Sequence, residues 1–323
     1  MRKGKVILGV DFGGTRIKIA MVDLEGRIRC RTGLDLRKTW SWKKLLEVLS
    51  ETVEALLAAS AIPKRAVLGL GMGLPGLVDF EKGSVHHLVN VRGWKNVPAA
   101  SLLRKRLKLP VFIDNDVNLM ALGEATYGAA RGFSYVICLT LGTGVGGGMI
   151  FKGQLYRGAT LSAGEVGHIP VSQNGPRCAC GSRGCLETYV GNRAISDRAR
   201  ERIRAGEKSL VQHWVGRRLR QVTPEMLSQA ARRGDRLSLS IWKEVGEWIG
   251  IGLTGLVNVY NPDRIVIGGG VAEAGEILFR QIRKTLKERA MTFPMKSLQV
   301  VKAKLGNDAG VIGASVLVRR SLE

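Results

Sequence analysis

The stretch Lys5–Asp23, KVILGVDFGGTRIKIAMVD, decides the fold, because it places an apolar β-strand on each side of the turn Phe12-Gly13-Gly14. The same unit returns later in the chain. The strand Tyr135–Leu141 leads into the glycine-rich turn Gly142–Gly148, and Met149–Phe151 is the returning strand. A repeated strand–turn–strand unit embedded among α and β elements predicts two α/β lobes with an active cleft between them.

Helical and strand patterns alternate around these two units. Apolar residues at helical spacing predict a helix over Trp42–Ser60, and a mostly helical stretch is expected from Thr188 to Tyr260. The other predicted elements are a strand after Gly26, the strands Ala66–Gly73, Pro110–Asp114, Arg264–Ile267 and Leu298–Lys304, and the helices Ala99–Leu107, Glu276–Arg289 and Ala309–Val318. The 42 glycines cluster in short loops, which indicates tight turns close to ligands.

The composition is that of a globular protein with a strongly basic surface. Of the 323 residues 45% are hydrophobic, and 50 Lys and Arg residues against 27 Asp and Glu residues give a net charge of +23. Such a charge raises the hypothesis of a polyanionic partner. The basic residues are spread along the chain without interleaved aromatic residues, so we favour a solvated basic surface and expect no nucleic-acid partner.

A membrane location is also not expected. A membrane-spanning helix needs about 20 consecutive apolar residues, and the sequence has no such run. The basic N-terminus leads into a short strand and shows no small-residue cleavage site after an apolar core, so we do not expect it to be a signal peptide. The cytoplasm is therefore the expected location.

The glycine turns have the composition of phosphate-binding loops. In the first, Gly13 and Gly14 let backbone N–H groups approach a phosphate, Thr15 adds a hydroxyl, and Asp11 is suited to hold Mg²⁺ through water. A simple hairpin turn is the alternative. The second, Gly142–Gly148, lacks the Gly-Lys-Ser/Thr ending of a Walker A loop and lies between two strands, which disfavours a dinucleotide fold.

A third glycine turn, Gly268–Gly270, follows a buried strand. Backbone without side chains offers a flat surface for a purine and its ribose, although a tight strand-to-helix connection explains the motif nearly as well. The first two turns together predict a nucleotide whose phosphates are held from both lobes.

Polar residues follow the apolar strand that ends at Asp114, in the run Asp114-Asn115-Asp116-Val117-Asn118. Catalytic groups gather at such strand ends. Phosphoryl transfer to an alcohol needs a carboxylate that orients the hydroxyl and accepts its proton. Asp116 or Asp114 suits that role, and Asn115 suits a neighbouring sugar hydroxyl. The alternative is that Asp116 or Asn118 only caps the following helix.

Four potential metal ligands lie close together in the sequence. His168 precedes Cys178, Cys180 and Cys185, and one His with three Cys fits a tetrahedral structural Zn²⁺ site. Zinc would hold His168 in one irregular loop together with the carboxylates of Glu165 and Glu187. Two carboxylates and an imidazole held together are suited to contact several sugar hydroxyls.

With these motifs in place, the chain closely resembles the ROK family of sugar kinases (repressor, open reading frame, kinase), and within it the ATP-dependent glucokinases. The resemblance runs from about Val6 to Ala314. Its most specific element is Glu165-Val-Gly-His168 with the following Cys-x-Cys-Gly-x-x-Gly-Cys-x-Glu run. The other matching elements are Asp11–Thr15, Leu74-Pro-Gly76 with Val78-Asp79, Asn115-Asp116, and Leu141–Gly144.

The resemblance implies the two-lobed fold of actin, hexokinase and Hsp70, which is ribonuclease H-like, with a cleft between the lobes. We place a small α/β lobe at residues 1–115 plus 305–323 and a large α/β lobe at 116–304, with the zinc-binding loop at 165–187. The family match also implies a homodimer or homotetramer.

The resemblance selects Asp116 over Asp114 as the catalytic base, and it implies zinc on one ring nitrogen of His168 with the other nitrogen turned toward the sugar. The implied zinc ligands are His168, Cys178, Cys180 and Cys185. The implied sugar contacts are Gly76, Asn90, Asn115, Asp116, Glu165, His168 and Glu187. The implied contacts to ATP and Mg²⁺ are Asp11, Gly13, Gly14, Thr15, Lys18, Thr143, Gly144, Gly269 and Gly270.

The predicted activity is phosphorylation of glucose to glucose 6-phosphate by Mg·ATP, with lobe closure excluding water. N-acetylglucosamine, N-acetylmannosamine, mannose and fructose remain alternative acceptors, and polyphosphate an alternative donor that the +23 charge would suit. A sugar-responsive transcriptional regulator is an alternative of another class. It is disfavoured because the phosphate motif begins at Asp11, which leaves no room for an N-terminal helix-turn-helix.

Overall fold

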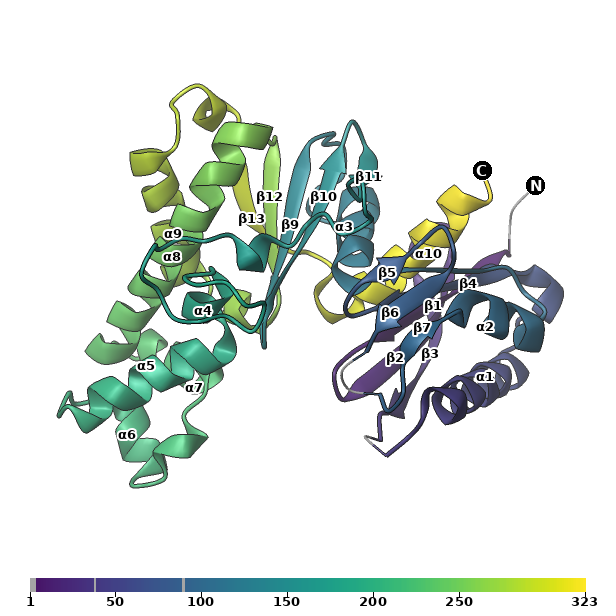
Figure 1. Cartoon of the computed structure of the whole chain (residues 1–323), viewed down its shortest axis with the longest axis horizontal. Helices are drawn as coiled ribbons and strands as arrows, with labels where there is room; N and C mark the ends of the chain where they lie inside the picture. Colours follow the sequence, from purple (N-terminus) through teal and green to yellow (C-terminus); the bar gives the residue numbers. More distant parts are fainter. Residues whose placement is uncertain (1–3, 38, 89–90) are drawn as a thin grey trace. The chain divides into compact units, whose positions relative to one another are not determined.

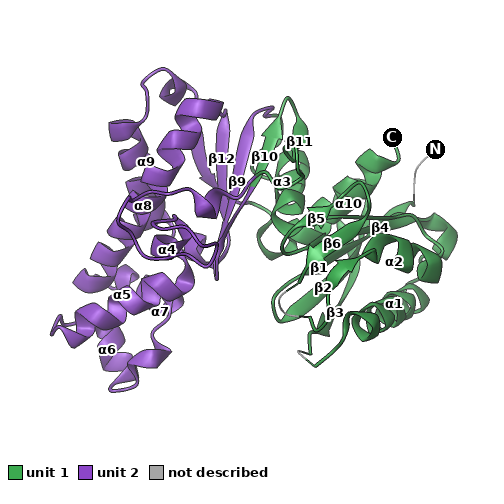
Figure 2. Cartoon of the chain, viewed as in Figure 1, with its two compact units in different colours: residues 1–132, 148–163, 304–323 green, residues 133–147, 164–303 purple. Residues whose placement is uncertain are grey.

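The computed structural model describes residues 4–37, 39–88 and 91–323, and the order of their elements is drawn in Figure 1. The chain divides into two compact units, coloured in Figure 2. The first unit comprises residues 1–132, 148–163 and 304–323, and the second comprises residues 133–147 and 164–303. Residues 116–132 are grouped with the first unit, whereas the sequence suggested a lobe boundary after residue 115.

The first unit is built on a five-stranded sheet with the order β3-β2-β1-β4-β8. The hairpin strands are antiparallel, and β1, β4 and β8 run parallel to one another. The carboxyl ends of these three strands therefore meet at one edge, where Gly73 pairs with Asp11 on one side and with Asp114 on the other. The strands are β1 Val6–Phe12, β2 Arg16–Asp23, β3 Ile28–Asp35, β4 Val67–Leu74 and β8 Val111–Asn115.

Helices cover both faces of this sheet. The first two pack with it into one apolar core, and the last helix of the chain packs on the opposite face against β1, β4 and α3. The helices are α1 Trp42–Ala59, α2 Ala99–Leu107, α3 Asp116–Tyr127 and α10 Ala309–Ser321. A small antiparallel sheet consists of β5 Val78–Asp79, β6 Ser84–His87 and β7 Lys95–Val97.

Several glycines of this unit serve packing rather than ligand binding, which corrects the interpretation from composition. A Cβ on Gly9 would lie 2.1 Å from the Val311 carbonyl oxygen, and one on Gly313 would lie 1.7 Å from the Leu119 carbonyl oxygen. The missing side chains let α10 lie directly on the sheet and on α3. Gly9 and Gly313 are thus explained by backbone contact.

The second sheet has the order β11-β10-β9-β12-β13. Its strands are β9 Val136–Leu141, β10 Val145–Phe151, β11 Gln154–Tyr156, β12 Arg264–Gly268 and β13 Gln299–Lys302. The helices of the second unit are α4 Glu187–Val190, α5 Asn192–Arg204, α6 Leu210–Val215, α7 Pro224–Arg232, α8 Arg236–Tyr260 and α9 Glu276–Arg289. The long helix α8 packs against α5, α7 and α9.

The predicted turn Gly142–Gly148 is too long. Strand β10 already begins at Val145, so only residues 142–144 form the turn. A Cβ on Gly147 would lie 2.3 Å from the Val166 side chain, and one on Gly148 would lie 2.8 Å from the Val117 carbonyl oxygen. These glycines are strand residues that allow close neighbours. Among the described residues, no helix is long and apolar enough to cross a membrane.

We expect Gly313→Ala to destabilise the first unit strongly. Its Cβ would overlap the Leu119 carbonyl oxygen at 1.7 Å, so α3 and α10 must separate at a cost of about 1–3 kcal/mol or more. Gly14→Ala is the matched control, since nothing lies within 4 Å of a Cβ there. Urea unfolding of both variants measures the difference, and equal free energies of unfolding would contradict the packing role.

Asp235 joins the starts of two helices in the second unit. It caps α8 by accepting a hydrogen bond from the Ser238 N–H at 3.0 Å, and it also accepts bonds from the Leu210 N–H and the Ser209 hydroxyl. Burial opposes ionisation of this carboxyl, but these hydrogen bonds and that of the Ser238 hydroxyl lower its pKa below the usual value.

Because the pKa of folded Asp235 is lowered, its stabilisation is full above the unfolded-state pKa and is lost as pH falls through the folded-state pKa. We expect Asp235→Ala to lower the free energy of unfolding by about 1–2 kcal/mol at neutral pH, with a smaller difference in acid. Thr223→Ala removes the uncharged cap of α7, and its effect should not change with pH. Denaturant unfolding across the acidic range compares the two.

Candidate active site and metal centre

The junction between β8 and α3 holds the candidate catalytic carboxylates. Asn115 is the helix cap: its side-chain oxygen accepts hydrogen bonds from the N–H groups of Val117 at 2.9 Å and Asn118 at 3.2 Å. The alternative that Asp116 or Asn118 caps this helix is therefore wrong. The Asn115 amide also donates to the Gly76 carbonyl oxygen at 3.2 Å, which ties two predicted sugar contacts together. Asp116 is the first residue of α3.

Asp114 is occupied by protein partners. Its carboxylate is 2% exposed, and one oxygen accepts hydrogen bonds from the Arg157 Nε at 2.9 Å and a terminal nitrogen at 2.7 Å. The other oxygen accepts from the Asn115 N–H at 2.8 Å and the Asn118 side-chain amide at 2.9 Å. A buried carboxylate bound to a guanidinium in this way has its oxygens engaged and positions its neighbours. The geometry therefore disfavours Asp114 as a proton acceptor for a substrate.

Sequence reasoning missed Arg157. This side chain holds Asp114 and stacks on the Phe80 ring, with its guanidinium carbon 4.1 Å from the ring centroid. A single arginine in the loop after β11 carries no motif and lies 43 positions from its carboxylate. Only the folded chain brings the two together.

The first glycine turn joins β1 and β2. The Gly13 N–H donates to the Arg16 carbonyl oxygen at 3.0 Å, and nothing lies within 4 Å of a Cβ on Gly14. At the base of the turn the Lys18 ammonium lies 3.3 Å from an Asp11 oxygen.

The start of α10 approaches the same place. Lys18 donates to the Asn307 carbonyl oxygen at 2.8 Å, and a Cβ on Gly310 would lie 2.5 Å from the Asp11 carboxyl carbon. Asp11 and Lys18 are thus held against the positive end of a helix, an arrangement suited to phosphate and its cation.

The turn at residues 142–144 is bound to the segment that follows the cysteines. A Glu187 oxygen accepts a hydrogen bond from the Val145 N–H at 2.9 Å, and the Asn192 N–H donates to the Gly142 carbonyl oxygen at 2.8 Å. A Cβ on Gly144 would lie 2.5 Å from that Glu187 oxygen. Glu187 therefore connects the second candidate phosphate turn with the candidate metal loop.

In the third glycine turn, Gly268–Gly270, the backbone geometry itself requires one of the glycines. Gly269 has a φ of 87°, and a Cβ there would lie 2.2 Å from the Leu141 carbonyl oxygen. The connection from β12 to the short 3-10 helix Gly270–Ala274 requires this glycine whether or not a nucleotide binds. Gly270 is exposed and lacks such close contacts, which leaves room for a ligand.

His168, Cys178, Cys180 and Cys185 come together, with all four ligand atoms within 4.8 Å of one another. The sulfurs of Cys180 and Cys185 are 3.7 Å apart, and the Cys178 sulfur is 3.5 Å from His168 Nδ1. Tetrahedral Zn²⁺ with Zn–S of about 2.3 Å and Zn–N of about 2.05 Å separates such atoms by about 3.8 and 3.6 Å. The side chains fit zinc, and the sulfurs are too far apart for a disulfide.

The environments of the thiols differ. Burial raises the pKa of the Cys185 thiol to about 12, whereas a hydrogen bond from the Ser182 backbone lowers the pKa of Cys180. Zinc binds thiolates, so a bound ion would displace these protons. His168 Nδ1 faces the sulfurs, and its Nε2 lies 3.9 Å from a Glu165 oxygen. Nδ1 is thus the nitrogen placed for zinc, and the use of Nε2 toward a sugar stays a prediction.

The predicted sugar contacts are divided between the units. Gly76, Asn115 and Asp116 lie in the first unit, while Glu165, His168 and Glu187 lie in the second. The predicted contact Asn90 lies outside the described residues.

Comparisons with known proteins agree on one family. The ROK family model matches residues 7–321. A glucokinase of Thermotoga maritima is 34% identical over 316 residues, 98% of each chain. The structure of a ROK family glucokinase from Streptomyces griseus in complex with glucose and AMPPNP superposes with a TM-score of 0.83 at 34% identity, covering 98% of this chain and 99% of that one. The structure of a ROK family transcriptional regulator, a homologue of the E. coli MLC protein, has a TM-score of 0.89 at 28% identity and covers 98% of this chain and 78% of the regulator.

The two sheet-based α/β units and these structural neighbours define the fold class of actin and hexokinase. Within that class, the chain belongs to the ROK family. The glucokinase relatives and the kinase structures identify it more narrowly as a ROK sugar kinase.

Proposed function

We propose that this protein transfers the γ-phosphoryl group of ATP to the C6 hydroxyl of glucose. The observation that carries the proposal is the arrangement at the β8–α3 junction, where Asn115 caps the helix and Arg157 binds Asp114. Of the two carboxylates, Asp116 is therefore the one suited to accept the proton of the sugar hydroxyl. A glucokinase relative and a glucokinase structure with glucose and AMPPNP support the choice of substrates.

The donor ATP would contact the glycine turns. Its phosphates would lie against the backbone of Gly13, Gly14 and Gly144, with the Thr15 and Thr143 hydroxyls and the Lys18 ammonium near them. Mg²⁺ would supply charge neutralisation on the phosphates, and the Asp11 carboxylate is suited to bind a water of its shell. The nucleoside would lie against Gly269 and Gly270.

A panel of sugars tests the acceptor. We expect purified protein with Mg·ATP to release ADP fastest with glucose, compared with N-acetylglucosamine, N-acetylmannosamine, mannose and fructose. Replacing ATP by polyphosphate in the same assay tests the donor. A higher kcat/KM with another sugar would replace glucose as the proposed acceptor, and a higher kcat/KM with polyphosphate would replace ATP as the proposed donor. In either case the protein would remain a sugar kinase.

A second candidate function is a sugar-responsive regulator, because a ROK regulator superposes with a TM-score of 0.89. The two functions differ in one measurement. A kinase turns over ATP many times in the presence of its sugar, whereas a regulator binds the sugar without turnover. Absence of ADP release with every sugar of the panel, together with retained sugar binding, would favour the regulator.

A further inference from the structure

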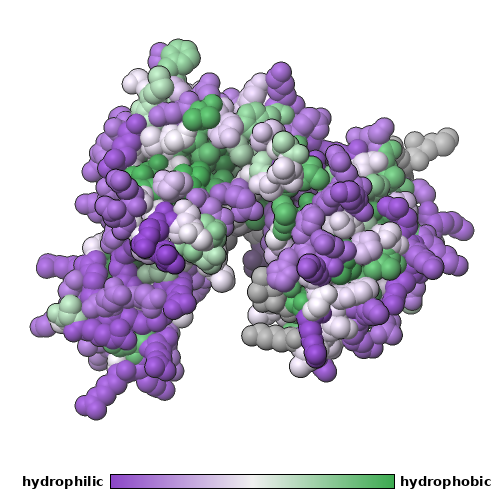
Figure 3. Space-filling model, viewed as in Figure 1, coloured by the Kyte–Doolittle hydropathy of each residue, from purple (hydrophilic) through white to green (hydrophobic). Residues whose placement is uncertain are grey.

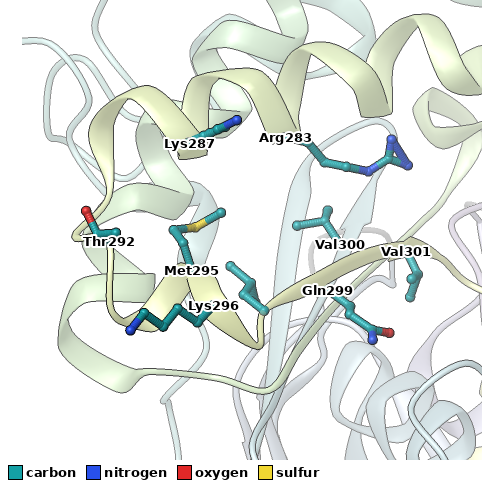
Figure 4. A pocket seen from close by; sticks show the side chains of 9 residues that line it. Arg283, Lys287, Thr292, Met295, Lys296, Gln299, Val300 and Val301 are labelled. Atoms are coloured by element: carbon teal, nitrogen blue, oxygen red, sulfur yellow. The ribbon is translucent and has the colours of Figure 1, made fainter.

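A groove in the second unit lies between α9 and the strand β13 (Figure 4). Its volume is about 790 Å³, and the segment between α9 and β13 also contributes to its walls. Apolar side chains line it, among them Met295, Leu298 and Val300. In Figure 3, hydrophobic residues interrupt the mostly hydrophilic surface of the second unit around the strands β12 and β13. The groove therefore offers an apolar site on a polar exterior, as interaction sites do.

The strand beside the groove has an open edge. β13 is the last strand in the order of the second sheet and pairs with β12. The Gln299 and Ala303 N–H groups donate to carbonyl oxygens on the β12 side at 3.1 and 2.9 Å. Because the backbone of a strand alternates, the N–H groups of Val300 and Lys302 point away from β12. Neither has a hydrogen-bond partner in the part of the chain that the structure describes.

Cations stand around the groove. Arg283 and Lys287 of α9 and Lys296 of the following segment line it, and Figure 4 shows all three. The Arg283 guanidinium is paired with Glu276 at 3.0 Å. Within residues 4–37, 39–88 and 91–323, Lys287 and Lys296 form no ion pair, and both are exposed. Two lysines are thus left to meet an acidic ligand.

The same cations decide what can occupy the open edge. Proteins place lysines at edge strands to keep two copies from pairing edge to edge. A second copy of this chain at β13 would bring Lys287 and Lys296 toward their own counterparts, and facing like charges strongly disfavour a contact. An acidic strand meets this edge with the opposite charge. Charge complementarity therefore favours an acidic partner over self-pairing.

We propose that β13 and the groove beside it bind an extended acidic segment of another protein, which adds as a further strand to the second sheet. Carbonyl oxygens of the segment accept hydrogen bonds from the Val300 and Lys302 N–H groups. Its apolar side chains enter the groove against Met295, and its carboxylates meet Lys287 and Lys296. In such strand addition the main-chain hydrogen bonds supply affinity, and pockets for alternate side chains supply specificity.

Fluorescence anisotropy of labelled peptides with the full chain tests the proposal. The probe is the blocked peptide Glu-Glu-Val-Thr-Val-Glu-Glu, whose two valines fall on one side of an extended strand. One control peptide has lysine in place of every glutamate. The other keeps the acidic sequence but is N-methylated at its three central residues, which removes strand pairing without changing charge. We expect both controls to bind at least about tenfold more weakly than the probe.

Charge reversal at the groove gives the matching protein variants. Lys287→Glu and Lys296→Glu should each weaken binding of the acidic peptide by about tenfold, because each places a like charge against its carboxylates. Lys208→Glu is the matched control. Lys208 is an exposed lysine at another groove of the second unit, so its variant changes the net charge equally and should bind the peptide like the parent.

Several outcomes would overturn the proposal. A parent chain that does not bind the acidic peptide overturns it outright. An N-methylated peptide that binds as tightly as the probe would show that the groove takes an apolar anion without strand addition. Equal binding of the lysine peptide, or equal weakening by Lys208→Glu and Lys287→Glu, would remove the groove cations from the argument. Thermal unfolding verifies that each variant is folded, and the three peptides test the parent chain without any substitution.

Discussion

Asp116→Asn should lower kcat for sugar phosphorylation by about 10²–10⁴, the usual contribution of a general base. Asparagine keeps the size and one oxygen of the side chain but cannot accept a proton from a hydroxyl. Asp116 is the first residue of α3, and its Oδ1 lies 3.0 Å from the Val117 nitrogen. The stability loss should therefore stay below about 1 kcal/mol, the value of one acidic residue at a helix start.

Asp114→Asn is the contrasting variant. Asp114 is buried and bound to Arg157, and removing one partner of a buried ion pair costs about 3–5 kcal/mol. We expect a clear loss of stability here, with activity falling because the β8–α3 junction loosens. Steady-state kinetics and urea unfolding of both variants separate the two roles. An Asp116→Asn enzyme with nearly parental kcat would refute the assignment of the base.

The sequence predicted the strand–turn–strand units and the order of the long elements, because alternation and helical spacing leave a clear pattern. It missed the short strands of the sheet β5-β6-β7, which have two to four residues each and no room for a pattern. It also assigned glycines such as Gly148 to turns, although β10 contains it. Composition cannot tell a glycine required by a turn from one required by a neighbouring backbone.

The candidate site was predictable where residues are close in the sequence. The predicted zinc ligands of the loop 165–187 lie within a short stretch, and the structure brings all four together. The residues alone could not decide between Asp114 and Asp116 as the candidate base. The two carboxylates differ because Arg157, which is distant in sequence, binds Asp114. The bond from Glu187 to the Val145 N–H at the start of β10 was likewise not predictable, since it depends on how distant segments pack.

Cys180→Ser should abolish zinc binding and with it tight sugar binding. Cys180 is exposed, while Cys178 and Cys185 are buried, so serine at 180 leaves no cavity and removes one ligand only. Zinc content measured by mass spectrometry should fall from about one ion per chain, as a four-ligand structural site holds, to a trace. Sugar affinity should fall by about tenfold or more, because the metal holds the ring of His168 in place.

The reason for this coupling lies in the chain between the metal ligands and the candidate sugar contacts. Glu187 follows Cys185 by two residues and is bonded to the Val145 N–H, and Glu165 lies 3.9 Å from the His168 ring. We therefore expect loss of the metal to loosen the segment that carries both carboxylates. Cys30→Ser is the matched control, since Cys30 is a partly buried free thiol outside the cluster. A zinc-free Cys180→Ser chain that binds glucose as tightly as the parent in calorimetry would show that the metal and the sugar site are independent.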